Sequence, residues 1–432
     1  MEDSNSNGRL SSFLESGIYR LHLLNAVFVD PVRVLNRCYT QFRLSPSRYY
    51  SRFFDTNICC DHHERTEDSN SKKRKRKENK KKKKKKEPPA LNERELAADE
   101  RHRQVRPLLL KAHECLMGAG DLLAVIRDLR NDFGSASESG GISSPVSECS
   151  LIELGSVWQA PFYEITLNLP QDYEPSSSCD QQNTQRVVAA FNNLVGNEME
   201  TEVVAQLLGR NYIIPRDSCF YMSDLGQIRN LIPAEPHCGF NLIVIDPPWE
   251  NASVRQKLMY PTLPNRHFFL LPIKQLSHVD GALVCLWVTN REKLRTFVEK
   301  ELLPAWGVSY MATFYWLKVK ADGSLLSDLD LLHHKPYECL LLGYCHGKGD
   351  VQGPAPVWQS SLRHMKADQI ILSIPGAYSR KPPVGELLLE LVPGLKPARC
   401  IELFAREMIA GWTSWGNEPL HFQDSCYFLS DD

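Results

Sequence analysis

The carboxyl-terminal half of the chain alternates short apolar runs with helical stretches, and this alternation is the strongest constraint on the fold. Short apolar runs are typical of buried strands, whereas apolar positions three and four residues apart are typical of helices. The candidate strands are residues 218–222, 241–245, 282–288, 311–318, 338–344, 369–374 and 399–404, and the candidate helices are 272–278, 291–303 and 384–392. Strands linked by crossover helices predict a doubly wound α/β sheet covered on both faces. We expect one domain over residues 213–432.

The amino-terminal half, residues 1–212, has a mixed character. Aromatic and β-branched residues between 17 and 58 predict strands broken at Asp30-Pro31. Apolar positions from 91 to 132 recur at helical spacing and predict two helices with a turn at 118–121. We further expect a Ser/Gly-rich loop at 134–150, a strand within 158–169 and a helical pair over 184–209 broken near Gly196. These elements predict an α+β accessory domain. The alternative, a half made only of linker, is disfavoured by the aromatic content.

One short tract carries much of the basic charge. The chain has 51 Lys and Arg against 52 Asp and Glu, but 13 of the basic residues lie between 72 and 86 beside a single acid, Glu78. The rest of the chain has 38 basic and 51 acidic residues, so its net charge is −13. Like charges at this density repel, and we expect a disordered insertion at about 61–90. A solvated linker is one interpretation. We favour a nuclear-localisation signal or a nucleic-acid tether, because linkers seldom need so many lysines, and we predict a nuclear protein.

Composition disfavours several classes of protein. The chain has no uncharged apolar run of about 18 residues, so we expect no membrane span. The start, Met1-Glu2-Asp3-Ser4, is acidic and unlike a secretory signal. The 13 cysteines are scattered without a C-x-x-C pair, which favours reduced intracellular thiols. The cysteines and histidines at 59–63 fit no standard zinc module, and we expect no metal.

The tetrapeptide Asp246-Pro247-Pro248-Trp249 follows a predicted strand, at the end where α/β sheets bind ligands. The Asp246 carboxylate can accept a hydrogen bond from an exocyclic amine such as N6 of adenine, and the carbonyl of Pro247 can accept the second amino hydrogen. The prolines fix the backbone and hold both acceptors in place before a substrate arrives. Trp249 offers a face on which a planar base could stack, worth about 1–3 kcal/mol. The alternative is a strand followed by a tight turn with Asp246 as a helix cap.

Further segments carry a resemblance to a known family. They are residues 241–249, 286–290, 334–338, 379–383, 401–406 and 411–418. On these segments, residues 213–420 resemble the MT-A70 family of S-adenosylmethionine-dependent N6-adenine methyltransferases, whereas the amino-terminal half resembles it only weakly. The resemblance implies a Rossmann-like, circularly permuted methyltransferase sheet, in which the catalytic strand precedes the cofactor strand at 400–404. No G-x-G loop follows that strand.

The resemblance also implies residues that bind S-adenosyl-L-methionine. Lys381 matches the family lysine that would pair with the cofactor carboxylate, with a plain loop lysine as the alternative. Asp246 is the candidate for the methionine amino group. The other candidates are Arg406 and Glu418 for the ribose hydroxyls, Asn417 and the backbone near Cys219 and Phe220 for the adenine, and Phe404 for the pocket wall. Glu407 and Met408 depart from a Pro-His-Asn segment of the relatives, so no contact is carried over from that segment.

Substrate contacts are predicted on two segments. The candidates are Tyr260, Trp287, Asn290 and Arg291. Tyr260 lies in a loop at 251–264 that would cover the pocket, whereas the other three follow another strand. Core packing is an equal alternative for Trp287. His333, His334 and Glu338 are expected to form a structural network behind the site, without a metal, because methyl transfer needs none.

Three functions compete. The first is adenine-N6 methylation of RNA, and the chain resembles a branch of the family associated with 2′-O-methyladenosine in U2 small nuclear RNA. The second is the same chemistry on DNA, since in either nucleic acid the base must leave its stack. The third is a non-catalytic nucleic-acid-binding subunit, which the retention of Asp246, Trp249, Lys381 and Asn417 disfavours. We expect a monomer, because the accessory domain and the basic tract could supply the nucleic-acid surface within one chain.

Overall fold

The structure is a computed structural model that describes residues 2–21, 25–50, 92–131, 150–169, 185–250, 262–331, 334–347, 369–392 and 397–429. The predicted insertion at 61–90, the basic tract, residues 59–63, most of the loop at 134–150, Tyr260 and His333 lie outside these ranges. Within the described ranges, no helix has the length and apolar character needed to cross a membrane.

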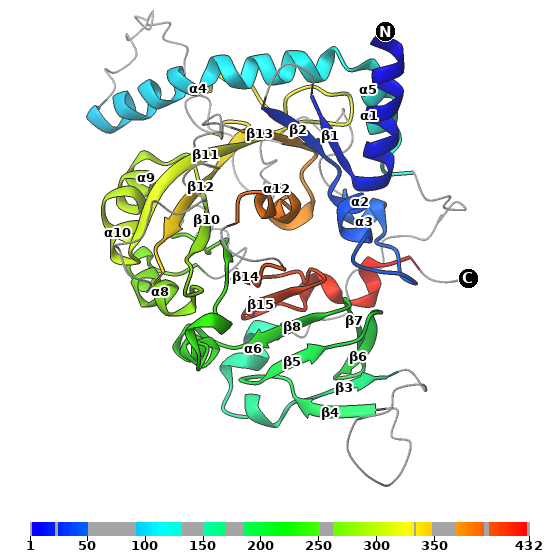
Figure 1. Cartoon of the computed structure of the whole chain (residues 1–432), viewed down its shortest axis with the longest axis vertical. Coiled ribbons are helices and arrows are strands. Elements are labelled where there is room, and N and C mark those ends of the chain that lie inside the picture. Colours follow the sequence, from blue (N-terminus) through cyan, green and yellow to red (C-terminus); the bar gives the residue numbers. More distant parts are fainter. Residues whose placement is uncertain are drawn as a thin grey trace, which may run out of the picture.

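Eleven strands form one mixed sheet in the order β1-β2-β13-β11-β12-β10-β9-β14-β15-β8-β5 (Figure 1). They are β1 (Ile18–Arg20), β2 (Ala26–Val29), β5 (Leu194–Asn197), β8 (Ser218–Met222), β9 (Leu242–Ile245), β10 (Ala282–Val288), β11 (Val308–Lys318), β12 (Tyr337–Cys345), β13 (Ile370–Ser373), β14 (Cys400–Leu403) and β15 (Trp412–Gly416). β10, β9, β14, β15 and β8 are mutually parallel, whereas β12 runs antiparallel between β10 and β11. The α/β class and the strands predicted between 218 and 404 are confirmed.

Helices cover both faces of this sheet. The α-helices are α1 (Glu2–Ser16), α2 (Pro31–Asn36), α3 (Pro46–Tyr49), α4 (Glu93–Met117), α5 (Gly120–Asp128), α6 (Leu151–Ser156), α8 (Ile273–Leu276), α9 (Glu292–Phe297), α10 (Leu303–Ala305) and α12 (Gly385–Leu389). Short 3₁₀ segments are η1 (Ala160–Phe162), η2 (Leu225–Leu231), η3 (Pro236–Cys238), η4 (Asn265–Leu270), η6 (Ala377–Ser379), η7 (His421–Gln423) and η8 (Ser425–Tyr427), and η5 (Val298–Leu302) is a π-helical turn.

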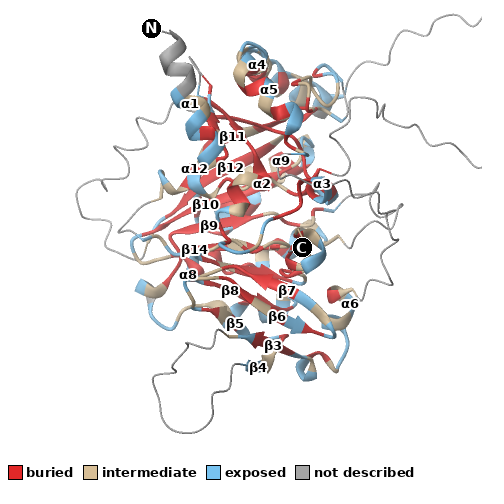
Figure 2. Cartoon of the chain, turned by 90° about the vertical axis from the view of Figure 1, so that its right-hand side faces the viewer, coloured by how far each residue is buried: buried red, intermediate tan, exposed pale blue. Residues whose placement is uncertain are grey.

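Side chains of the central strands alternate between two apolar layers. Ile243 and Ile245 of β9 belong to the larger core cluster, with apolar residues of α4, α5, α8 and α9. Leu242 and Val244 of the same strand belong to a second cluster, with apolar residues of α12. All four residues of β9 are buried, and the central strands lie in the buried interior of Figure 2. Burial on both faces explains why these strands appear in the sequence as continuous apolar runs.

A second, antiparallel sheet has the order β4-β3-β6-β7. Its strands are β3 (Glu164–Asn168), β4 (Gln185–Ala189), β6 (Val203–Leu207) and β7 (Arg210–Ile214). The helical pair predicted over 184–209 is therefore wrong, because β4, β5 and β6 occupy that segment. Its valines fit a pleated surface better than a helix, and β6 buries alternate residues, as a strand with one covered face does. Leu208 and Gly209 have positive φ, as in tight hairpin turns.

The segment after β2 is helical, not extended as predicted. Asp30 accepts hydrogen bonds from the backbone N–H groups of Val32 and Arg33, and Pro31 is the first residue of α2. Both are strong signals for a helix start, and they outweigh the β-branched composition. Among the described residues of 17–58, the predicted strands are therefore confirmed only at β1 and β2, whereas α4 and α5 confirm the two helices predicted after residue 91.

The amino-terminal half shares the large sheet. β2 pairs with β13 and β1 pairs with β2 at one edge, and β5 pairs with β8 at the other. The predicted boundary between residues 212 and 213 falls inside β7. α4 is attached through Arg101, which lies 3.1 Å from Glu292 and 3.3 Å from Glu299. The two halves of the chain are thus joined by backbone pairing as well as by side chains.

Candidate active site at the carboxyl ends of the parallel strands

Asp246 lies at the edge of the sheet where the central parallel strands end. It directly follows β9, and its backbone N–H donates to the carbonyl of Leu403, the last residue of β14, at 3.3 Å. The register pairs Ile245 with Leu403 and with Leu286, so the ends of β9, β14 and β10 lie side by side. The predicted position of the tetrapeptide, at a strand's carboxyl end, is confirmed by these contacts.

Lys381 lies between two carboxylates. Its Nζ atom is 3.2 Å from Oδ1 of Asp246 and 3.4 Å from Oε2 of Glu338. Glu338 also contacts Lys318 at 2.5 Å. Burial opposes ionisation of Glu338, but Lys318 and Lys381 outweigh it and lower the pKa of this carboxyl to about 2. Burial likewise disfavours the charged form of Lys381, but Asp246 and Glu338 raise its pKa overall. At neutral pH this group therefore holds an ionised Glu338 and a charged Lys381.

An open pocket adjoins this ion-pair group. Its lining includes Asp246, Trp287, Lys381, Phe404 and Arg406, all of which the sequence predicts for the site. The structure thus brings these five predicted residues together.

Glu402 also lines the pocket, and sequence reasoning missed it. Burial raises the pKa of its carboxyl to about 8; Asp246 and Glu407 add to this effect, and Arg406 and Lys381 oppose it. The sequence did contain a signal for Glu402, because it is a single acidic residue inside the buried run of β14. An ionisable side chain in such a strand seldom has a purely structural role.

The raised pKa of Glu402 predicts a pH-dependent stability. In the unfolded chain this carboxyl ionises near pH 4.5, and in the folded protein near pH 8. The folded state therefore holds the extra proton between these values, and stability falls as pH rises through that window. We expect Glu402→Gln to reduce the loss of melting temperature between pH 6 and pH 9, measured without cofactor. Equal slopes for both proteins would contradict the prediction. Glu390→Gln, at an exposed carboxylate, is the control and should keep the wild-type slope.

Phe404 forms the turn that follows β14. Its φ is 64°, a conformation that costs a bulky residue roughly 1–3 kcal/mol and is concentrated at functional sites. The ring packs against Phe268 and Trp415, with centroid distances of 5.6 and 5.1 Å. A Cβ on Gly416 would lie 2.8 Å from the carbonyl oxygen of Ala405, so only glycine permits this close backbone approach. Aromatic packing therefore supports a sharp turn that has no glycine of its own.

The tetrapeptide is held by hydrogen bonds of its own. The carbonyl of Pro247 accepts from the N–H of Trp249 at 2.8 Å, and its second lone pair leaves room for another donor. The indole N–H of Trp249 donates to the carbonyl of Trp287 at 2.8 Å. Trp249 is only 7% exposed and its ring packs edge-on against Phe268. The ring is thus mostly covered, which leaves little of the stacking face that the sequence suggested.

Two predicted cofactor contacts fall short of the strand end. Phe220 is fully buried in the core beneath the small sheet, and the thiol of Cys219 lies 3.2 Å from the hydroxyl of Thr413. β8 continues to Met222, so Ser223 and Asp224 occupy the strand end instead. Ser223 bonds there to the carbonyl of Gly416 and to the indole N–H of Trp415.

Of the predicted substrate contacts, one lines the pocket and two make hydrogen bonds near it. Trp287 is 2% exposed and packs against Trp316, so it serves the core as well as lining the pocket. Asn290 donates to the carbonyl of Tyr337, and Arg291 donates to the carbonyl of Glu250 at 3.3 Å.

The last two cofactor candidates follow β15. Asn417 is exposed, and Glu418 pairs with His421 at 3.2 Å. A structural network of His333, His334 and Glu338 was predicted behind the site. Glu338 instead forms an ion pair with Lys381, so the network is seen only in part. The carbonyl of His334 accepts from Ser327.

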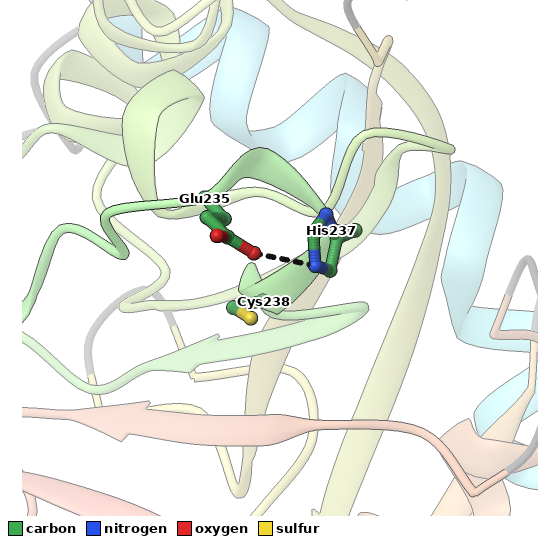
Figure 3. A group of neighbouring side chains, drawn as sticks. All are labelled: Glu235, His237 and Cys238. Carbon is green, nitrogen blue, oxygen red and sulfur yellow. Dashed lines mark ion pairs between the residues drawn. The ribbon is translucent and has the colours of Figure 1, made fainter.

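One group of metal-ligating side chains occurs in the described residues, and it lies elsewhere. Glu235, His237 and Cys238 place their ligand atoms within 4.8 Å of one another (Figure 3). Glu235 and His237 form an ion pair at 2.8 Å. These residues precede β9, whereas Asp246 follows it, so the group takes no part in the candidate active site.

Comparison with known proteins agrees with this geometry. The MT-A70 family matches residues 240–418, which include Asp246, Lys381 and Arg406. The chain is 34% identical over 350 residues to N(6)-adenine-specific methyltransferase METTL4 of Mus musculus, which covers 79% of this chain and 70% of the relative. It is 31% identical over 222 residues to N6-methyladenosine RNA methyltransferase MTA1 of Pyricularia oryzae, covering 49% of this chain and 55% of the relative.

A third relative is the DNA N6-methyl methyltransferase of Caenorhabditis elegans. The identity is 30% over 227 residues, covering 51% of this chain and 56% of the relative. The family resemblance seen in the sequence is confirmed by these matches, of which the first spans most of both proteins. The chain therefore belongs to the MT-A70 family and is an adenine-N6 methyltransferase of this S-adenosyl-L-methionine-dependent family.

Proposed function

We propose that the chain methylates N6 of adenine in RNA, with 2′-O-methyladenosine of U2 small nuclear RNA as the substrate. The observation that carries the chemistry is the position of Asp246, which follows β9 and is held by Lys381 at the wall of the pocket. An acceptor fixed in this way suits an exocyclic amine, whose hydrogens must be bound as its nitrogen attacks. Preorganised acceptors of this kind are a main source of catalysis.

The pocket residues fit S-adenosyl-L-methionine. Lys381 would bind the cofactor carboxylate and is already oriented by Asp246 and Glu338. Asp246 would accept from the methionine amino group, and Arg406 and Glu418 would bind the ribose. Ser223, Asp224 and Asn417, at the ends of β8 and β15, would surround the adenine. When bound, the cofactor supplies an activated methyl group. The residues named here orient it and exclude water.

The order of strands supports a circularly permuted sheet. β14, the proposed cofactor strand, comes late in the chain but lies between β9 and β15 in the sheet. β9, which carries Asp246, comes earlier. We propose that the cofactor half of the sheet has moved to the end of the chain, so that the two functional strand ends remain adjacent although their order is reversed.

The proposal that RNA is the substrate is tested with oligonucleotides of matched sequence. The names of two relatives differ, since one refers to RNA and the other to DNA. We expect methyl transfer to an RNA that contains 2′-O-methyladenosine to exceed transfer to the unmodified RNA and to the DNA of the same sequence. The 2′-substituent is the group that distinguishes these substrates. Equal or faster transfer to DNA would overturn the RNA proposal and favour the DNA alternative.

The basic tract at 72–86 is proposed as a nucleic-acid tether and nuclear signal that works in a monomer. Deleting it should weaken RNA binding and reduce the slope of log affinity against log salt by about 0.7 for each phosphate that the tract neutralises. Filter binding at several salt concentrations measures both quantities. An unchanged affinity and slope would leave the tract only a role in localisation, which the distribution of a fluorescent fusion reports. Sedimentation of the whole chain tests the monomer.

A further inference from the structure

Arg380, the residue directly before Lys381, is buried against two aromatic rings. Its guanidinium carbon lies 4.2 Å from the ring centroid of Tyr49 and 4.0 Å from that of Phe422. The residue is 4% exposed. A planar guanidinium stacked on aromatic rings in a desolvated place is held strongly. Two rings from distant parts of the chain therefore fix the segment that carries Lys381.

One of these rings comes from the amino-terminal half. Tyr49 ends α3 and is 1% exposed. A Cβ on Gly376 would lie 2.8 Å from its ring, so the backbone that leads to Lys381 runs directly over Tyr49. The Tyr49 hydroxyl is buried and has no hydrogen-bond partner among the described residues. The contact of Tyr49 with Arg380 is thus made through its ring.

Arg380 also forms an ion pair with Glu407. Glu407 directly follows Arg406, and both residues, like Arg380, line the pocket. Both partners are mostly buried, since 3% of the Arg380 side chain and 17% of the Glu407 side chain are exposed. One ion pair therefore joins the segment of Lys381 to the segment of Arg406. The side chain of Arg406 strengthens this link by donating to the carbonyl of Tyr378 at 2.9 Å.

Strand pairing does not set the distance between these two segments. The segment of Lys381 follows β13 and that of Arg406 follows β14, and four strands lie between β13 and β14 in the sheet. At about 4.8 Å per strand, the two strands are roughly 24 Å apart. The segments meet only because the first one crosses back over the sheet. Side-chain contacts must therefore fix their relative position.

We infer that Arg380 and Glu407 are positioning residues, which hold Lys381 and Arg406 at the spacing that the cofactor requires, with Tyr49 and Phe422 as the supporting walls. The inference rests on the proposed cofactor roles of Lys381 and Arg406. It gives the amino-terminal half a direct part in cofactor binding.

The test is Glu407→Gln in the full chain, which keeps the shape of the side chain and removes its charge. We expect the Kd for S-adenosylhomocysteine, measured by calorimetry, and the KM for S-adenosylmethionine to rise about tenfold, because small misplacements of binding groups are costly. The KM for the oligonucleotide should change by less than about twofold, since the pair joins the two proposed cofactor segments. Tyr49→Leu should act in the same direction, and Tyr49→Phe should bind the cofactor like the wild type.

The matched control is Glu299→Gln. Glu299, on η5, pairs with another buried arginine, Arg295, at 2.5 Å, and the pocket lining does not include either residue. Cofactor affinity should be unchanged there, even if the melting temperature falls as much as in Glu407→Gln. An equal loss of affinity in both variants would show a general destabilisation and would overturn the inference.

Two further outcomes separate this inference from the proposed function. If Glu407→Gln binds the cofactor like the wild type while Lys381→Met weakens binding, the positioning role is wrong and the proposed function stands. If the wild type itself fails to bind S-adenosylhomocysteine and S-adenosylmethionine, the proposed function fails, and the inference fails with it.

Discussion

Asp246→Ala is expected to lower kcat by about 10³-fold or more, because it removes the proposed acceptor for the attacking amine. Lys381 keeps Glu338 as a partner at 3.4 Å, so the ion-pair group is not left without a carboxylate. The protein should therefore still fold, with circular dichroism and a cooperative melting transition like those of the wild type. Single-turnover methylation of a radiolabelled oligonucleotide measures the chemical step directly.

Two companion variants sharpen this result. Asp246→Asn keeps an acceptor oxygen and the shape of the side chain, so it should retain more activity than the alanine variant. Asp280→Ala removes an exposed carboxylate just before β10, at the opposite edge of the sheet, and should leave kcat unchanged. Turnover of Asp246→Ala within about tenfold of the wild type would exclude Asp246 as the central acceptor.

Glu338→Gln is expected to have the second-largest effect. It removes the carboxylate that Lys318 and Lys381 share, and it leaves two ammonium groups close together. Removing one member of a buried ion-pair group costs about 3–5 kcal/mol. Lys381 should also lose part of its fixed position, so the KM for S-adenosylmethionine should rise. Urea unfolding at pH 7 measures the first effect, and steady-state kinetics the second.

The pH dependence of this effect has a defined sign. The pKa of Glu338 is depressed in the folded protein to about 2, from an ordinary value of 4.5. The stabilisation is therefore present above pH 4.5 and is lost as pH falls toward 2. The difference between wild type and variant should shrink in that window.

Two further variants help to interpret the stability of Glu338→Gln. Lys318→Met added to Glu338→Gln should recover part of the stability, because the second ammonium group is then removed. Glu390→Gln, which breaks an exposed ion pair with Arg20, should cost less than about 1 kcal/mol. A Glu338→Gln protein as stable as Glu390→Gln would show that the buried group contributes nothing to folding.

Sequence reasoning worked where a signal is local. The run Leu242–Ile245 is apolar at every position and buried on both faces, so its strand and the place of Asp246 followed directly. It failed over 184–209, where short valine-containing runs fit a helix or a strand and only pairing with β3 and β8 decides. Asp30-Pro31 is compatible with a strand break, but the same pair is a strong start signal for a helix, and the helix prevails.

The same distinction applies to the residues of the candidate site, some of which have a local sequence signal and some of which do not. Asp246, Lys381, Phe404 and Arg406 were each predicted from a recognisable segment, and all four line the pocket. Cys219 and Phe220 lie within β8, whose end at Met222 depends on its register with β15, and the sequence alone did not set that end. The contact of Tyr49 with Arg380 spans more than 300 residues of sequence, and no single-sequence pattern reports such a pairing. The burial that shifts the pKa of Glu402 likewise exists only in the folded chain.

The strands that the amino-terminal half adds to the large sheet also protect it from other chains. β2 covers the outer side of β13, and β5 covers that of β8. A protein that began at residue 213 would lack β1, β2 and β5, and would expose the backbone N–H and C=O groups of β13 and β8 along two open edges. Open edges of this kind pair with neighbouring molecules and cause aggregation. The region that carries the MT-A70 segments is therefore expected to aggregate when it is produced by itself. The first 212 residues cover two of its sheet edges and thereby reduce self-association.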